Sequence, residues 1–152
     1  MEIRHVRETL ITGLSLRTDN ATEMDPTTAT IGKLWQAFDN TVPVDYKKGE
    51  RVYGVYFDYE SDHTGLFSVL AGFNGSTFPE HSALKQVVIP EGQYLVFSHE
   101  GDMPKIAIDA WTEVWQYFAN ENVEQQRLYT TDFEYYPSSN KIEVHIAIKS
   151  FE

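Results

Sequence analysis

The sequence predicts an α+β fold in which two strand-helix-strand-strand units build one curved antiparallel sheet, with two helices flanking a central cleft. Two observations predict this fold. The order strand, helix, strand, strand occurs twice, in pseudo-repeats of about residues 1–77 and 83–152, and short stretches of the two halves match residue for residue. Because such repeats usually bury a shared core together, we expect a single domain over residues 1–152. Grooves between repeats are natural ligand sites, so we expect the cleft to hold a ligand.

The clearest match between the halves lies in the predicted helices. Residues 34–40 align without a gap on residues 114–120, and four of the seven pairs are identical. With one common offset, short pieces of the strands also align, residues 52–53 on 128–129, 57–59 on 133–135 and 70–71 on 146–147. Asp58 is thereby the repeat mate of Glu134. It could pair with Glu134, or it could be an exposed aspartate at the end of a strand.

The first half begins with loose alternation of apolar and polar residues over residues 3–17, which predicts a strand with a bulge near Gly13. Asp25 followed by Pro26 is a typical helix start, an N-cap with Pro at the first helical position. Apolar residues then recur at helical spacing until Asn40, which predicts a helix of about three to four turns. Two strands over residues 51–59 and 65–73 follow, joined by a hairpin over residues 60–64.

The second half repeats this order. Residues 84–98 form a predicted strand that the segment 90–92 should bend, and residues 102–120 form a predicted helix. The apolar side of that helix contains Ile106, Ile108, Trp111, Val114, Trp115 and Phe118. Two closing strands over residues 128–136 and 141–151 are separated by turn residues 137–140. In the last strand the residues expected to face the core are Ile142, Val144, Ile146 and Ile148.

Composition and charge exclude several kinds of site. The 152 residues contain no cysteine, which excludes disulfides and thiolate metal ligands and fits a reducing cytoplasm. The formal net charge of -11 is spread along the chain without a basic stripe, so we expect no direct binding of nucleic acid. The chain has no apolar run of membrane length, and its five histidines show no metal-ligand spacing. We therefore expect a cytoplasmic protein with no membrane contact, no bound metal and no cofactor.

Glu134 lies near the middle of a predicted strand that is rich in aromatic residues. Alternation over residues 128–136 puts Asp132, Glu134 and Tyr136 on one face and Phe133 on the other. A carboxylate on a face shared with apolar groups needs a partner, because removing its water is costly. That partner could be internal or a ligand. Alternatively, Glu134 lies on an edge strand and simply points into water, and periodicity alone favours neither.

Three motifs together resemble the GyrI-like effector-binding domains, namely residues 31–38 (IGKLWQAF), 89–94 (IPEGQY) and 133–136 (FEYY). This family includes the drug-sensing domains of AraC-type and MerR-type regulators such as Rob and BmrR, the small gyrase inhibitors, and stand-alone copies on integron cassettes. The resemblance covers essentially the whole chain. It implies a cleft that takes amphipathic, often cationic, compounds, with Glu134 as the acidic group at the bottom. No helix-turn-helix precedes Met1, so we expect any transcriptional control to need a partner regulator.

We predict that a cationic ligand binds over aromatic faces in this cleft, with Glu134 as its countercharge. Cation–π contacts contribute roughly 0.5 to 2 kcal/mol each, and apolar burial adds about 25 cal/mol per Å². The predicted ligand-binding residues are Glu134, Trp35, Trp115, Tyr56, Phe67, Tyr94 and Tyr136. Trp35 and Trp115 are repeat mates and should face each other across the axis that relates the repeats. Each aromatic could instead fill the core, and bulges could reverse the direction of Phe67 or Tyr94.

Three functions fit these observations. We favour a stand-alone effector-binding or sequestering protein for amphipathic, cationic, drug-like molecules over an enzyme. The first alternative is a hydrolase of reactive xenobiotics in which Glu134 serves as general base beside Tyr136, provided that burial raises the pKa of Glu134. The second is a protein-interaction module that resembles the gyrase inhibitors and uses its acidic surface against a basic partner. The sequence leaves the natural ligand and the oligomeric state open.

Overall fold

The computed structural model describes residues 1–120 and 122–149. In this part of the chain the strands are β1 (Glu2–Val6), β2 (Thr9–Thr18), β3 (Val52–Phe57), β4 (Phe67–Phe73), β5 (Lys85–Ile89), β6 (Gly92–Glu100), β7 (Thr131–Ser138) and β8 (Lys141–Ala147). The helices are α1 (Asn20–Met24), α2 (Ile31–Thr41), α3 (Lys105–Ala119) and the short 3-10 helix η1 (Tyr46–Lys48). No helix among these residues is long and apolar enough to cross a bilayer.

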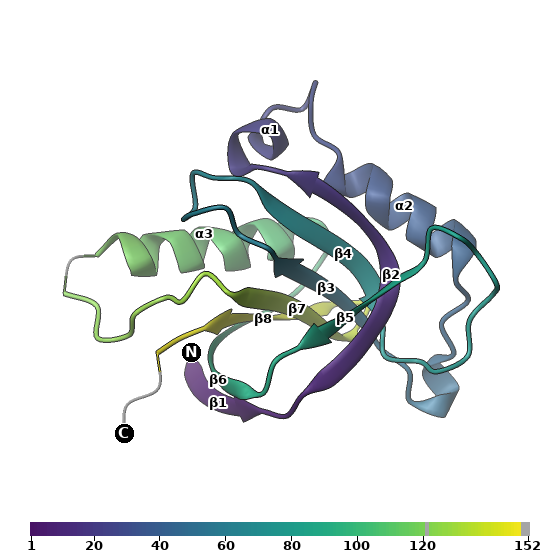
Figure 1. The fold of residues 1–152 in the computed structure, drawn as a ribbon. Helices are drawn as coiled ribbons and strands as arrows, with labels where there is room; N and C mark the ends of the chain where they lie inside the picture. Colours follow the sequence, from purple (N-terminus) through teal and green to yellow (C-terminus); the bar gives the residue numbers. More distant parts are fainter. Residues whose placement is uncertain (121, 150–152) are drawn as a thin grey trace.

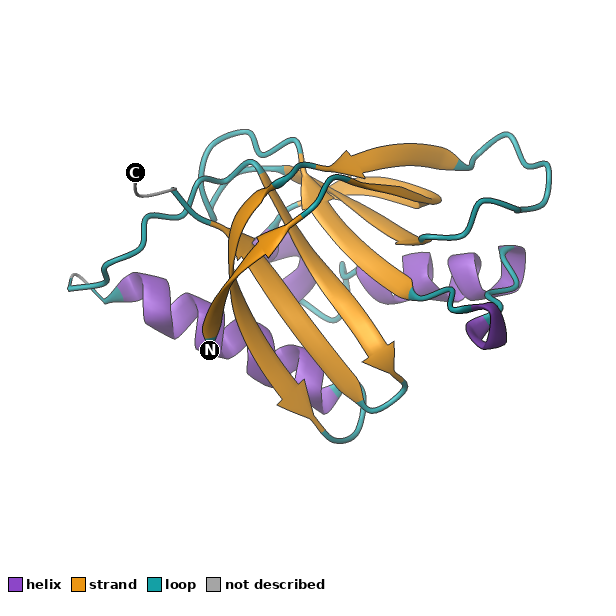
Figure 2. Ribbon diagram, turned by 90° about the horizontal axis from the view of Figure 1, so that it is seen from below, coloured by secondary structure: helices purple, strands orange, loops and turns teal. Residues whose placement is uncertain are grey.

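All eight strands form one antiparallel sheet in the order β1-β6-β8-β7-β3-β4-β2-β5. If each strand is exchanged with its counterpart in the other half (β1 with β5, β2 with β6, β3 with β7 and β4 with β8), the order is the same read from the opposite edge. A pseudo-twofold axis therefore passes between the central strands β3 and β7. The sheet curls, and the helices lie on one of its sides (Figures 1 and 2). The predicted α+β fold of two repeated units with a curved antiparallel sheet is confirmed.

The predicted first strand of each half is wrong, because each is two strands. Residues 3–17 divide at Arg7 and Glu8 into β1 and β2, and residues 84–98 divide at Pro90 and Glu91 into β5 and β6. Strand β1 pairs with β6, and β5 pairs with β2, so each half contributes an edge strand to the other half. The predicted bulge at Gly13 is also wrong. Both ladders of β2 run in register through Gly13, where an added Cβ would lie only 1.9 Å from the carbonyl oxygen of Ala71.

The first predicted helix start is wrong as well. Asp25 accepts a hydrogen bond from the backbone N–H of Thr27 and is the C-cap residue of α1, and it is the N-cap of neither helix. The N-cap of α1 is Asp19. The start of α2 is capped from a distance, because the Glu23 carboxylate accepts the backbone N–H groups of Thr30 and Ile31, each at 2.9 Å. Glu23 therefore joins α1 to α2.

The closing hairpin of the second half also differs from its predicted limits. Residues 128–130 precede β7, and Tyr129 adopts a left-handed conformation with φ 56°. Pro137 and Ser138 belong to β7, so the turn is limited to Ser139 and Asn140. Strand β8 ends at Ala147, and the predicted strand end at residue 151 lies outside the described residues.

Apolar residues fill both faces of the sheet. On the face toward the helices, α2 packs on a cluster that includes Phe38 and Phe73, and α3 packs on a second cluster that includes Phe97. A third cluster on the opposite face includes Tyr94 and Phe133. The predicted inward direction of Ile142, Val144, Ile146 and Ile148 is confirmed by their place in the α3 cluster.

Candidate functional site

A cavity of about 570 Å³ opens on the helix-facing side of the sheet, between α1 and α3. Its lining residues are Asn20, Glu23, Met24, Ile31, Tyr56, Tyr59, His63, Phe67, Ala107, Ile108, Trp111, Thr112, Trp115, Arg127 and Glu134. The walls are mostly apolar and aromatic. Met24 and Ile108 are exposed large apolar residues, at 69% and 61%, and they leave an apolar rim on the cavity. A volume of this size suits one drug-sized organic molecule.

Glu134 on β7 forms part of the cavity lining although it is only 3% exposed. Its Oε2 accepts hydrogen bonds from Tyr56 Oη at 2.9 Å and Trp111 Nε1 at 2.6 Å, and its Oε1 accepts one from Tyr136 Oη at 2.8 Å. These three donors are neutral. Among the described residues, no Lys, Arg or His forms an ion pair with Glu134.

The environment of Glu134 disfavours the charged form of its carboxyl group. Burial raises the pKa of the carboxyl group, and the hydrogen bonds from Trp111, Tyr136 and Tyr56 act in the opposite direction. Burial beside this carboxylate also raises the pKa of Tyr56 and of Tyr136 well above their ordinary value, which keeps both phenols protonated as donors. The site is therefore a desolvated carboxyl group that neutral donors hold in one position.

The adjacent strand leaves room for this carboxylate. Gly54 on β3 pairs with Glu134 in the ladder, and a Cβ on Gly54 would lie 2.4 Å from Glu134 Oε1 and 3.0 Å from Trp35 Cζ2. Any side chain at Gly54 would therefore collide with the carboxylate or with the indole. The glycine allows both groups to lie against the backbone of β3.

A second buried carboxylate lies two residues away on β7. Asp132 is 0% exposed, and its Oδ2 accepts hydrogen bonds from Arg127 Nη2 at 2.9 Å and Tyr59 Oη at 2.5 Å, while Oδ1 accepts the backbone N–H of Ala147 at 2.8 Å. Arg127 reaches Asp132 because a bridge to Ile148 fixes its backbone just before β7. This carboxylate, unlike Glu134, has a cationic partner within the protein.

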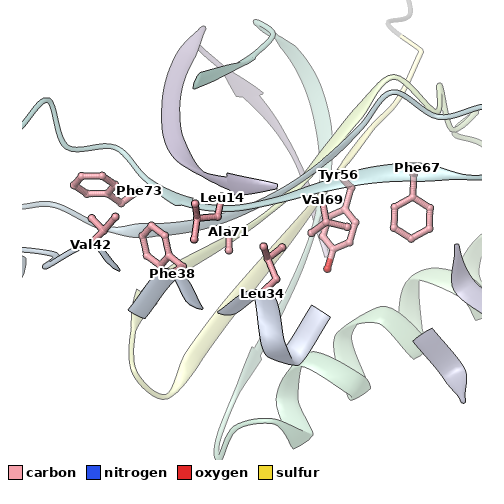
Figure 3. Packing of buried hydrophobic residues seen from close by; sticks show 9 residues of the cluster. All are labelled: Leu14, Leu34, Phe38, Val42, Tyr56, Phe67, Val69, Ala71 and Phe73. Carbon is pink, nitrogen blue, oxygen red and sulfur yellow. The ribbon is translucent and has the colours of Figure 1, made fainter. Parts of the chain in front are cut away.

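Six of the seven predicted ligand-binding residues lie at or next to the cavity. Tyr56, Phe67, Trp115 and Glu134 line it. The cluster under α2 extends from Phe73 and Phe38 at one end to Tyr56 and Phe67 at the other (Figure 3). Tyr136 lies behind the wall, where its hydroxyl supports Glu134, and Trp35 packs edge-on against the Tyr136 ring at 5.7 Å.

Two predictions about the aromatic walls are wrong. Tyr94 lies on the opposite face of the sheet, packed against Phe133, with its hydroxyl donating to the carbonyl of Pro90. The reason is strand parity, because Leu95 on β6 packs toward α3 and Tyr94 must therefore point away. Trp115 does not face its repeat mate Trp35. Its neighbour in the cavity wall is Trp111, with ring centroids 6.4 Å apart.

Three residues that line the cavity were missed in the sequence. Trp111 was assigned only to the apolar side of its helix, and periodicity cannot reveal that its indole N–H reaches Glu134. Tyr59 and Arg127 lie outside strands, where alternation gives no direction. Asp58, the other predicted carboxylate of interest, is exposed at the end of β3 and does not pair with Glu134. Within the described residues, no group of three or more His, Cys, Asp or Glu is placed to hold a metal ion.

Comparisons with known proteins agree with this architecture. The profile of the Cass2 family, described as integron-associated effector binding proteins, matches residues 2–148. An integron cassette protein from the mobile metagenome of Vibrio cholerae has a crystal structure that is 40% identical in sequence, with a TM-score of 0.86 over 97% of this chain and 95% of that one. A search of curated proteins found no significant match.

More distant structures share the fold alone. SAV2435, solved with bound tetraphenylphosphonium, is 16% identical, with a TM-score of 0.69 over 98% of this chain and 93% of that one. The C-terminal domain of EcmrR is 11% identical, with a TM-score of 0.56 over 99% and 97%. The resemblance drawn from three short motifs is thereby confirmed. Since the family profile spans nearly the whole chain, the protein belongs to the Cass2 family of integron-associated effector-binding proteins.

Proposed function

We propose that this protein binds amphipathic, cationic, drug-like molecules in the cavity over Glu134, as a stand-alone effector-binding or sequestering protein. One observation carries the proposal. The Glu134 carboxylate is buried, accepts three hydrogen bonds from neutral donors, and has no cationic partner among the described residues. A cation that enters the cavity would meet a countercharge that is already desolvated and oriented.

The walls of the cavity suit the apolar part of such a ligand. Tyr56, Phe67, Trp111 and Trp115 offer aromatic rings, and cation–π contacts over such rings contribute roughly 0.5 to 2 kcal/mol. The tetraphenylphosphonium bound to SAV2435 is an aromatic cation of this class, and it suggests related phosphonium ions as first ligands to test. The likeness to the EcmrR domain supports a relation to transcription regulators. A partner regulator and a cytoplasmic location remain predictions.

The hydrolase alternative has less support in the geometry. A general base needs a free lone pair directed at the proton that it removes, and three of the roughly four acceptor sites of the Glu134 carboxylate are already occupied by hydrogen bonds from the protein. No specific contact favours the interaction-module alternative. Incubation with an activated aryl ester, followed through several turnovers for released product, tests the hydrolase alternative directly.

Two ligands of nearly equal shape test the proposal. Methyltriphenylphosphonium carries a positive charge, whereas triphenylphosphine oxide is neutral. We expect the cation to bind more tightly, and Glu134→Gln to weaken its binding by at least about 1 to 2 kcal/mol while hardly changing that of the oxide. Glu60→Gln, at an exposed loop position, makes the same change in net charge and serves as the control. Equal losses for both ligands in Glu134→Gln would leave only a packing role for Glu134.

A further inference from the structure

Arg127 forms a second polar feature of the same cavity, which cation binding at Glu134 does not use. Its side chain is only 7% exposed, and it lines the cavity together with Glu134. One guanidinium nitrogen, Nη2, donates to Asp132, and the guanidinium group lies 4.4 Å from the ring centroid of Tyr129. These contacts hold the group in one orientation.

The Nε of Arg127 lacks a hydrogen-bond partner. Among the described residues it is the one buried side-chain nitrogen or oxygen in this condition. Buried polar groups are nearly always hydrogen-bonded, and a charged donor without an acceptor is especially costly. Nε itself is shielded from the cavity, but Arg127 lines the cavity and, among the described residues, only its Nη2 makes a hydrogen bond, so the remaining guanidinium N–H groups are candidate contacts for a ligand.

Arg127 and Glu134 are held at a defined separation. Asp132, which holds Arg127, and Glu134 lie two residues apart on the same face of β7, so about 7 Å separates their backbone positions. Tyr56 lies opposite Asp132 in the ladder and donates its hydroxyl to Glu134, which connects the two positions across β3. The cavity thus has a carboxylate on one residue of β7 and a cationic donor held by a second carboxylate two residues before it.

We propose that Arg127 is an acceptor-binding subsite, so that the preferred ligands carry a neutral acceptor oxygen, such as an ester or ketone carbonyl, several ångströms from their cationic group. This inference rests on the proposed function. The acceptor is neutral because Asp132 already compensates the charge of Arg127, and because Glu23 and Glu134 both line the cavity and would repel a ligand carboxylate.

Three dyes with one xanthylium cation test this subsite by fluorescence anisotropy. Tetramethylrosamine has an unsubstituted phenyl ring, tetramethylrhodamine methyl ester adds a carbonyl acceptor to that ring, and tetramethylrhodamine carries the free carboxylate. On the unchanged protein we expect the ester to bind about tenfold more tightly than the rosamine, the usual order for a hydrogen bond from a charged donor. We expect the free acid to bind no more tightly than the ester.

Variants of the ion pair separate this subsite from general cation binding. In the double variant Arg127→Met with Asp132→Asn, which removes both charges together, we expect the ratio of the ester affinity to the rosamine affinity to fall from about ten to about one. Arg127→Lys keeps a cation beside Asp132 but lacks the further N–H groups of the guanidinium, and it should also lower the preference if the double variant does not fold. Thermal unfolding checks both proteins.

The outcomes distinguish the two proposals. Equal affinity for the rosamine and the ester in the unchanged protein, or a preference that survives in both variants, would overturn the Arg127 subsite alone. A free acid that binds more tightly than the ester would overturn the neutral acceptor. If Glu134→Gln weakens none of the dyes, the proposed cation site itself fails, whatever Arg127 does.

Discussion

Gly54 lies directly opposite Glu134 in the ladder between β3 and β7, and its missing side chain leaves the space in which the carboxylate lies. A Cβ there would come within 2.4 Å of Glu134 Oε1. These strands are also the two central strands of the sheet, next to the pseudo-twofold axis. The position of the buried charge therefore depends on a glycine in the other repeat.

Gly54→Ala should displace the Glu134 carboxylate and press on the Trp35 indole. We expect a loss of stability of about 1 to 3 kcal/mol, typical of overpacking, and weaker binding of methyltriphenylphosphonium. Gly32→Ala on α2 is the matched control, because a Cβ there meets nothing within 4 Å and the helix should gain about 0.5 kcal/mol. Chemical denaturation and calorimetric titration measure the two effects. Unchanged binding in Gly54→Ala would show that the carboxylate position does not matter for the ligand.

Trp111→Phe should alter the titration of Glu134 while retaining an aromatic wall. The indole N–H of Trp111 stabilises the charged carboxylate, so its removal should raise the pKa of Glu134 further and move the pH midpoint of cation binding upward. Trp115→Phe is the control, since Trp115 contacts the ring of Trp111 and makes no hydrogen bond to Glu134. Similar midpoints in both variants would contradict a specific role for the Trp111 hydrogen bond.

The sequence alone reveals the repeats and the sheet, because both depend on local patterns, whereas the periodicity around Glu134 leaves its burial undecided. Alternation places Glu134 and Tyr136 on one face and Phe133 on the other, and the structure agrees. The break between β1 and β2 is not visible in the same way. Apolar residues occur on both sides of the polar residues Arg7 and Glu8, and only pairing with different partners, β6 and β4, shows that the strand divides there.

The missed contacts of the site depend on tertiary geometry. Trp111 lies on the apolar side of α3 like any core residue. Its N–H reaches Glu134 only because α3 packs close to the sheet at this point. Arg127 precedes β7 in an irregular segment, and its partner Asp132 follows five residues later after the left-handed Tyr129. The face of the sheet to which Tyr94 points depends on the residue at which β6 begins after Pro90. The spacing of apolar residues in the sequence therefore does not predict the contacts of Trp111 and Arg127 or the direction of Tyr94.

Arg127→Met should be strongly destabilising. It leaves Asp132 as a buried carboxylate without a cation, and breaking a buried pair from one side typically costs about 3 to 5 kcal/mol. Adding Asp132→Asn to the same chain should recover part of that loss. Chemical denaturation of both single variants and the double variant gives the coupling energy. Additive losses would show that the pair does not act as a unit.

His145 should make the fold sensitive to mild acid. Its ring stacks on Phe133 with centroids 4.1 Å apart, its Nδ1 lies 3.0 Å from the backbone carbonyl of Glu143, and its Nε2 lies 3.3 Å from Arg4 Nη1. Burial lowers the pKa of His145 to about 4 from its ordinary value of 6.5. The unfolded chain therefore takes up the proton first, and stability should fall as pH drops from 6.5 toward 4, by up to roughly 3 kcal/mol.

Denaturation midpoints between pH 7 and about 4 measure this effect. His145→Gln should flatten the pH dependence over that range, because the group that takes up the proton on unfolding is gone. His81→Gln changes an exposed histidine and should keep the original slope. A slope that persists in His145→Gln would assign the acid sensitivity to another group.

Binding of a permanent cation should release protons from Glu134. Burial raises the pKa of this carboxyl group in the free protein, so its contribution to stability is fully present below the unfolded-state pKa and is lost as pH rises through the folded-state pKa. A bound cation favours the ionised form and lowers the pKa again. Affinity for methyltriphenylphosphonium should therefore fall as pH drops through the pKa of the free protein, which is opposite in sign to the stability trend.

Calorimetric titration in two buffers with different ionisation heats counts the protons that are released. We expect a fraction of one proton per ligand near the pKa of the free protein, and none in Glu134→Gln. The same titrations give affinity at each pH, so both predictions come from one set of measurements. If affinity is independent of pH between about 5 and 8 and no proton is released, Glu134 is already ionised before the ligand arrives. In that case the three hydrogen bonds to the carboxylate outweigh its burial, and the cavity offers a permanent negative charge.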